Sequence, residues 1–139
     1  MSKVGSITEV TTKTDFYSDL FTDFTRHANT GELNKKTNEN AVKQSVRNLL
    51  LTNKYERLFH PEIGSNLKAL LFENMTPHLP QICNDYIAEV FENHEPRAEF
   101  LYADINFDPD RNNANISIYF MIINSQVQAV LPITIERTR

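Results

Sequence analysis

The spacing of apolar residues changes at one stretch, His94-Glu95-Pro96-Arg97, and this change restricts the fold more than any other feature. Before it, apolar residues recur at helical spacing, and after it they alternate as in β-strands. Pro96 cannot extend a helix and biases Glu95 towards extended backbone. The sequence therefore predicts an α+β fold, with N-terminal helices packed on a C-terminal three-stranded antiparallel meander. Glu95 and Arg97 flank the corner, as internal structure or as a contact point for a partner.

Three helices are predicted before the corner. The first runs from about Glu39 to Thr52, with Asn38 as its N-cap. Ser65 caps a short second helix, and the third begins with Thr76 as N-cap and Pro77 in the first helical position. The apolar stripes expected to face the core are Val42, Val46, Leu49 and Leu50, then Leu67, Leu70 and Leu71, and finally Leu79, Ile82, Cys83, Tyr86, Val90 and Phe91.

Three strands are predicted after the corner. The central one, 116–123, is apolar on both faces, as expected for a strand with neighbours on both sides. Because proline has no N–H to donate to a ladder, Pro132 predicts an edge position for the third strand, with residue 132 turned to the open side. The inward side chains are expected to be Leu101, Ala103, Ile105 and Phe107 in the first strand and Val127, Ala129, Leu131, Ile133 and Ile135 in the third.

The chain of 139 residues suits one core. We expect residues 1–38 to form an N-terminal arm and aromatic flap, and residues 39–139 to form a single domain. The stretch Phe16–Phe24 holds four aromatic residues in nine. A flap on the core is the favoured interpretation of this stretch, and an arm that docks to a partner is the alternative.

Composition argues against several classes of protein. The net charge of −4 argues against a nucleic-acid binder, and the longest apolar run is too short to span a membrane. The single cysteine, Cys83, excludes an internal disulfide, and no histidine pair has helical metal-site spacing. We therefore predict no metal and no cofactor. The N-terminus lacks the apolar segment of a signal peptide, so a reducing cytosol is the expected compartment.

No catalytic residue is predicted. The sequence holds no Gly-rich phosphate loop and no nucleophile elbow, so no small-molecule substrate is expected. A glycosidase needs two carboxylates across a cleft, one of them with a raised pKa. With 18 acidic residues in the chain, such pairs arise by chance, and solvated charge is the favoured interpretation. The candidates are Glu73, Glu89, Glu92, Glu95 and Glu99.

A set of motifs resembles the small baseplate wedge proteins of contractile phage tails, the sheath-initiator family, whose relatives include a type VI secretion baseplate component. The similarity covers about Ala41 to Arg139 and departs from the family at Tyr55, Ile63 and His94, where Gly or an aromatic residue is usual. The motifs occur in the family's order and are Leu50-Leu51-Thr52, Glu56-Arg57, Pro61-Glu62-Ile63-Gly64, Leu71–Pro77 and Glu95-Pro96-Arg97.

This resemblance implies a structural role in a virion tail baseplate, assembled in the host cytoplasm. Glu95, Pro96 and Arg97 are expected to hold the helical core bundle of larger wedge proteins. The sheet is expected to exchange strands with the tail sheath subunit and so to start sheath polymerisation. The alternatives are a peptidoglycan-cleaving, lysozyme-like enzyme and a type VI secretion baseplate adaptor. The residues expected to meet the sheath are Val127, Gln128, Val130, Thr134, Glu136 and Arg137.

Overall fold

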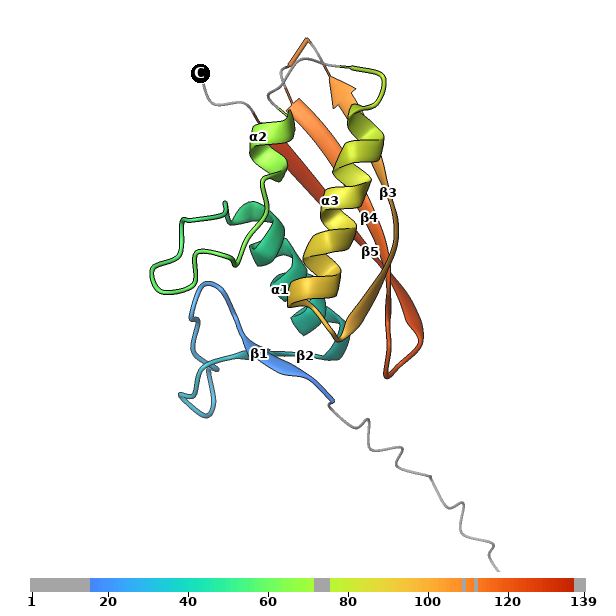
Figure 1. Cartoon of the computed structure of the whole chain (residues 1–139). Coiled ribbons are helices and arrows are strands. Elements are labelled where there is room, and N and C mark those ends of the chain that lie inside the picture. Colours follow the sequence, from blue (N-terminus) through green and yellow to red (C-terminus); the bar gives the residue numbers. More distant parts are fainter. Residues whose placement is uncertain (1–15, 72–75, 109, 112, 137–139) are drawn as a thin grey trace, which may run out of the picture.

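The computed structural model describes residues 16–71, 76–108, 110–111 and 113–136 (Figure 1). A two-stranded ribbon comes first, followed by helices and then by a sheet. The elements in chain order are β1 (Ser18–Leu20), β2 (Lys35–Thr37), α1 (Asn38–Leu51), α2 (Leu67–Leu71), α3 (Leu79–His94), β3 (Ala98–Asp108), β4 (Asn113–Ile122) and β5 (Val127–Glu136).

The larger sheet is an antiparallel meander with strand order β3-β4-β5. The helices cover one of its faces, with α3 on β3 and α1 on β5 (Figure 1). The core lies between these two layers, which confirms the predicted α+β class. Its fully buried side chains come from the helices and from the inward face of the sheet, among them Val42, Val46, Leu50, Leu67, Ile87, Ile116, Ile118, Phe120, Ile122 and Ile133.

The central and edge positions of the last two strands are confirmed. β4 pairs with both neighbours, and β5 pairs with β4 alone. Only one face of β4 is fully buried, because the helices cover only one side of the sheet. The outward side chains Ser117, Tyr119 and Met121 are partly covered. On β5 the alternation holds from Ala129 onward, while Val127 at the start is 44% exposed.

The prediction that Leu101 faces inward is wrong. Phe100 lies opposite Phe120 and Tyr102 lies opposite Tyr119, so Leu101 is an extra residue without a partner on β4. A β-bulge of this kind shifts the alternation by one residue. Leu101 is consequently 43% exposed, and Phe100 packs against the core in its place.

Both predicted caps of the long helices are wrong. Thr37 is the N-cap of α1, and it makes no side-chain hydrogen bond there. The Asn38 side chain instead accepts hydrogen bonds from the N–H groups of Phe16 and Tyr17. α3 begins at Leu79 rather than at Pro77, because residues 76–79 form a turn that separates Pro77 from the helix.

The buried face of α3 is rotated relative to the predicted stripe. Ile87 is fully buried, whereas Ile82 is 38% exposed and Tyr86 is half-buried. Apolar residues occupy more than half of the helix circumference, so periodicity alone does not choose between these two arcs. The Ser65 hydroxyl accepts from the N–H of Leu67 as expected, and it also donates to the carbonyl of Leu50. The sequence predicts that this helix ends at Asn74-Met75, but those two residues and the Leu71 side chain lie outside the described residues.

The β1–β2 ribbon connects the N-terminal segment to α1. The strands pair over three residues each, and the Gln44 side chain of α1 donates to the carbonyl of Leu20 at 2.6 Å. The partial burial of Tyr17 and Phe21 accords with a flap on the core. The division into 1–38 and 39–139 stays a prediction.

Candidate functional site

The corner that connects α3 to β3 consists of Glu95, Pro96 and Arg97. Glu95 is the C-cap of α3, and its N–H donates to the carbonyl of Phe91 at 3.0 Å. The carbonyl of Glu95 then accepts from Ala98 N–H at 3.2 Å, which closes a turn with Pro96 exposed. This turn ends the helix and sets the direction in which β3 starts.

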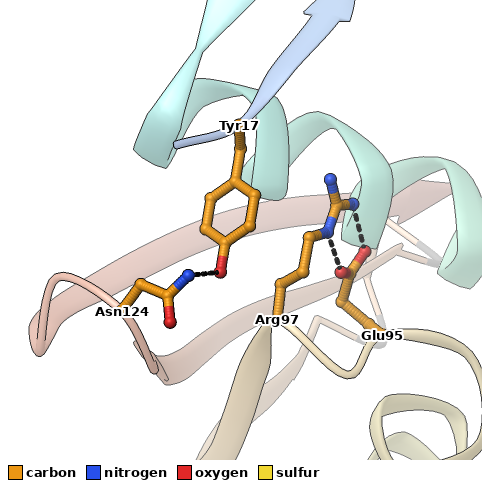
Figure 2. Close-up of polar contacts among 4 residues, drawn as sticks. All are labelled: Tyr17, Glu95, Arg97 and Asn124. Atoms are coloured by element: carbon orange, nitrogen blue, oxygen red, sulfur yellow. Dashed lines mark hydrogen bonds and ion pairs between the residues drawn. The ribbon is translucent and has the colours of Figure 1, made fainter. Parts of the chain in front are cut away.

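Glu95 and Arg97 form a two-pronged ion pair inside this corner (Figure 2). Arg97 Nε lies 2.5 Å from Glu95 Oε1, and Arg97 Nη2 lies 2.8 Å from Glu95 Oε2. The glutamate is 1% exposed, whereas the arginine side chain is 30% exposed. The hydrogen bond to Glu95 raises the pKa of Arg97 above its usual range. Glu95 thus orients the guanidinium, and Arg97 is the member of the pair that reaches the surface.

Tyr17 joins the flap to the corner. The Arg97 guanidinium carbon lies 5.5 Å from the centre of the Tyr17 ring, and Asn124 Nδ2 donates to Tyr17 Oη at 2.5 Å (Figure 2). Asn124 lies in the turn between β4 and β5, 107 residues beyond Tyr17. The sequence reasoning missed both residues, since neither carries a local signal for this contact.

Asn84 occupies part of the outer edge of β3, and its hydrogen bonds show in which direction the backbone groups of the sheet point. On β3, the N–H and the C=O of Ala103 both bond to the side-chain amide of Asn84 from α3. These backbone groups therefore point away from β4. Ala103 and Ile118 are therefore a pair without hydrogen bonds between them. In an antiparallel ladder the backbone groups of Ile118 then point to its other neighbour, β5.

The same alternation gives the orientation of β5. Leu131 lies opposite Ile118 and bonds to it, so the next residue, Pro132, turns its backbone to the free edge. The missing N–H of Pro132 therefore interrupts no bond within the sheet, as predicted. Among the predicted sheath-contact residues on β5, Gln128, Val130, Thr134 and Glu136 share this orientation, Val127 alternates with them, and Arg137 lies outside the described residues.

The candidate catalytic glutamates are differently placed. Glu92, Glu95 and Glu99 line one hollow beside Pro96. Both carboxylate oxygens of Glu95 accept hydrogen bonds from Arg97. Glu89 lies 3.8 Å from Lys54, and Glu73 falls outside the described residues.

The remaining features considered from the sequence are Cys83, possible metal ligands and apolar helices. Cys83 is fully buried, and burial raises the pKa of its thiol to about 11. Within the described part of the chain, no group of three His, Cys, Asp or Glu side chains is arranged to hold a metal ion. None of the described helices has the length and apolar character needed to cross a membrane.

Comparison with known families gives a match that extends from α1 through the corner to the end of β4. The family model described as baseplate wedge protein gp25 matches residues 36–127, which is more than half of the chain. The chain therefore belongs to the baseplate wedge protein gp25 family, as its motifs indicated.

A curated relative is similar to this chain in sequence. Baseplate wedge protein gp25 of Enterobacteria phage T4 is 32% identical over 85 residues, which span 61% of this chain and 64% of the phage protein. The match thus covers less than two thirds of that relative.

Solved structures share the fold. A chain in the sixfold-symmetrised cryo-EM structure of the anti-feeding prophage baseplate matches with a TM-score of 0.68 and 26% identity, covering 78% of this chain and 86% of that one. A proposed tail lysozyme from Geobacter sulfurreducens matches with a TM-score of 0.64 over 70% of this chain and 89% of its own. At 18% identity, this second likeness shows a shared fold only.

Proposed function

We propose that this chain is a structural protein of a contractile-tail baseplate. Its family membership and its likeness to a chain of the anti-feeding prophage baseplate support this proposal. Its partners would be larger wedge proteins, held at the corner, and the tail sheath subunit, engaged at the sheet edge. It would be located in the baseplate of the tail, after assembly in the host cytoplasm.

The observation that carries the proposal is the partly exposed guanidinium of Arg97, which Glu95 holds in one orientation. Glu95 takes the Nε and Nη2 edge of the group, which leaves Nη1 without a hydrogen bond or ion pair to any described residue. Pro96 is exposed beside it. A planar group held in one orientation loses little entropy when it bonds carbonyl or carboxylate oxygens of another chain. Pro96 and Arg97 would touch the core bundle, and Glu95 would act by positioning Arg97.

The sheath contact is assigned to β5 because the other edge is partly closed. Asn84 occupies the outward backbone groups of Ala103 on β3. Within the described chain, no backbone bond joins the outer edge of β5 to another segment. An added strand would pair on either side of Pro132, near Gln128 and Val130 or near Thr134 and Glu136.

Arg97→Lys tests the corner, because lysine keeps the charge and loses the planar fork. The matched control is Arg111→Lys at the tip of the β3–β4 hairpin, where the arginine side chain is 80% exposed. The tagged chain is isolated from cells that make the whole particle, and its partners are quantified by mass spectrometry. Arg97→Lys should lose the large wedge proteins, and Arg111→Lys should keep them. Equal recovery by both folded variants would refute the proposed role of the corner.

A turnover assay separates the structural role from a lysozyme-like enzyme. Three candidate glutamates share the hollow beside Pro96, which makes purified peptidoglycan the substrate to try. A structural protein should release no more soluble fragments than buffer. Release that Glu92→Gln or Glu99→Gln abolishes would favour the enzyme.

A further inference from the structure

The loop between α1 and α2, residues 52–65, presents large apolar side chains to solvent. Tyr55, Leu58 and Phe59 are 82%, 85% and 95% exposed. Together they expose on the order of 500 Å² of largely apolar surface. The loop projects outward beside α1 and α2 (Figure 1).

The loop holds its shape without a partner. At its base, Ser65 N–H donates to the carbonyl of Thr52 at 2.8 Å. Gly64 crosses this point so closely that a Cβ would lie 2.7 Å from the same oxygen. Nearer the tip, Tyr55 N–H donates to the carbonyl of Pro61 at 2.9 Å. A compact loop of this length with closed ends is an Ω-loop, and such loops frequently carry function.

The backbone at the tip is strained in order to display these side chains. Tyr55 and Phe59 both have φ of +70°, a left-handed conformation that bulky residues avoid. Packing does not compensate at Phe59, whose side chain is almost fully exposed. Strain at an exposed aromatic residue points to a function outside the free chain.

The charges of the loop indicate the chemistry of the partner. The Glu56 carboxylate accepts from Asn53 N–H at 2.9 Å, and Glu62 lies 3.3 Å from His60, so both acids are turned to the loop itself. Arg57, next to Leu58, has no hydrogen bond or ion pair to any described residue. The tip thus offers apolar surface together with one available cation. A lipid surface fits less well, because it favours several cations around an apolar tip.

We propose that loop 52–65 is a docking element whose tip inserts Leu58 and Phe59 into an apolar pocket on a neighbouring protein chain, with a carboxylate at the pocket rim for Arg57. This contact is additional to the corner and the β5 edge. It needs no change of conformation, since the loop is already closed at its base.

Phe59→Asn tests the proposal in cells that assemble the particle with this chain supplied in variant form. Asn tolerates left-handed backbone, so the purified variant should melt at the same temperature as the wild type or higher. Phe24→Asn is the matched control, since Phe24 is also exposed, at 66%, with φ of +52°, and lies on the β1–β2 flap. We expect at least a tenfold loss of assembled particles with Phe59→Asn and none with Phe24→Asn.

A photo-crosslinking side chain at position 59 identifies the occupant. The expected adduct joins this position to a different protein of the particle, within a segment that holds apolar residues and an Asp or Glu. Arg57→Glu should reduce the yield of this adduct at least fivefold. Normal assembly with Phe59→Asn would overturn the proposal, as would adducts with a second copy alone. Binding of the wild type to anionic phosphatidylserine vesicles that Phe59→Asn abolishes would also overturn it. If the wild-type chain is absent from the particles, the proposed baseplate function itself is refuted. If the wild-type chain is present and Phe59→Asn assembles normally, only the loop proposal is refuted.

Discussion

The corner ion pair makes a sharp prediction about stability. Arg97→Met removes the guanidinium and leaves the Glu95 carboxylate 1% exposed, with both of its oxygens deprived of their partner. Breaking a buried pair from one side costs about 3–5 kcal/mol. We therefore expect a loss of about 3 kcal/mol, or a melting temperature lower by roughly 10 °C.

The reverse substitution should cost less. In Glu95→Leu, the partly exposed guanidinium of Arg97 regains water, so the expected loss is about 1 kcal/mol. The double variant Glu95→Leu/Arg97→Met has no unpaired charge in the corner and should also lose only about 1 kcal/mol. These values give a coupling energy of about 3 kcal/mol between the two positions.

Urea unfolding followed by circular dichroism at pH 7 measures all four proteins. The slopes against urea should agree, so that midpoints report stability alone. If Arg97→Met loses less than about 1 kcal/mol, the Glu95 carboxylate reaches water when its partner is gone, which would refute the reasoning from its burial. Additive losses in the double variant would refute the coupling in the same way.

Three further predictions concern the core, the loop base and the sheet edge. The pKa of the Cys83 thiol is about 11 in the folded chain and 9.0 in the unfolded chain. Between pH 9 and 11 the thiol therefore loses its proton in the unfolded state only, so the free energy of unfolding falls as the pH rises over this range. The stability difference between wild type and Cys83→Ala should therefore shrink by about 2–3 kcal/mol across that range in chemical denaturation, whereas a constant difference would contradict the burial of the thiol. Gly64→Ala should destabilise by about 3 kcal/mol in thermal melts, because φ is +139° and the new Cβ meets a backbone oxygen, while Gly31→Ala, with open space around it, should cost only about 1 kcal/mol. Asn84→Ala should cost about 2 kcal/mol and free the outward N–H and C=O of Ala103, so sedimentation should detect concentration-dependent association that the wild type lacks.

Three predictions from the sequence are wrong, and the structure gives the reason for each. Asn38 and Thr76 are good capping residues by type, yet Asn38 binds the backbone of the flap and Thr76 lies in a turn before α3. Leu101 alternates correctly with its neighbours until the bulge shifts the register. At Asn38 and Leu101 an interaction with another segment outweighed the local preference, whereas at Thr76 the chain forms a local turn before the helix begins.

The exposure of apolar side chains at the loop tip is also not predictable from the sequence. Leu58 and Phe59 are residues that composition alone would assign to a core. Their exposure depends on the closure of the loop at Gly64 and Ser65, which involves contacts with Thr52. Solvent exposure is a property of the whole fold, so no pattern within the segment announces it.

What the sequence determined by itself was the order of helices and strands, the corner at Pro96 and the edge position of β5. These features follow from short-range rules: the period of apolar residues, the fixed φ of proline and its missing N–H. Only the tertiary structure decided that Glu95 is buried under Arg97 and that Tyr17 meets Asn124. Those contacts join segments up to 107 residues apart, and they form because the core brings the flap, the corner and the β4–β5 turn to one place.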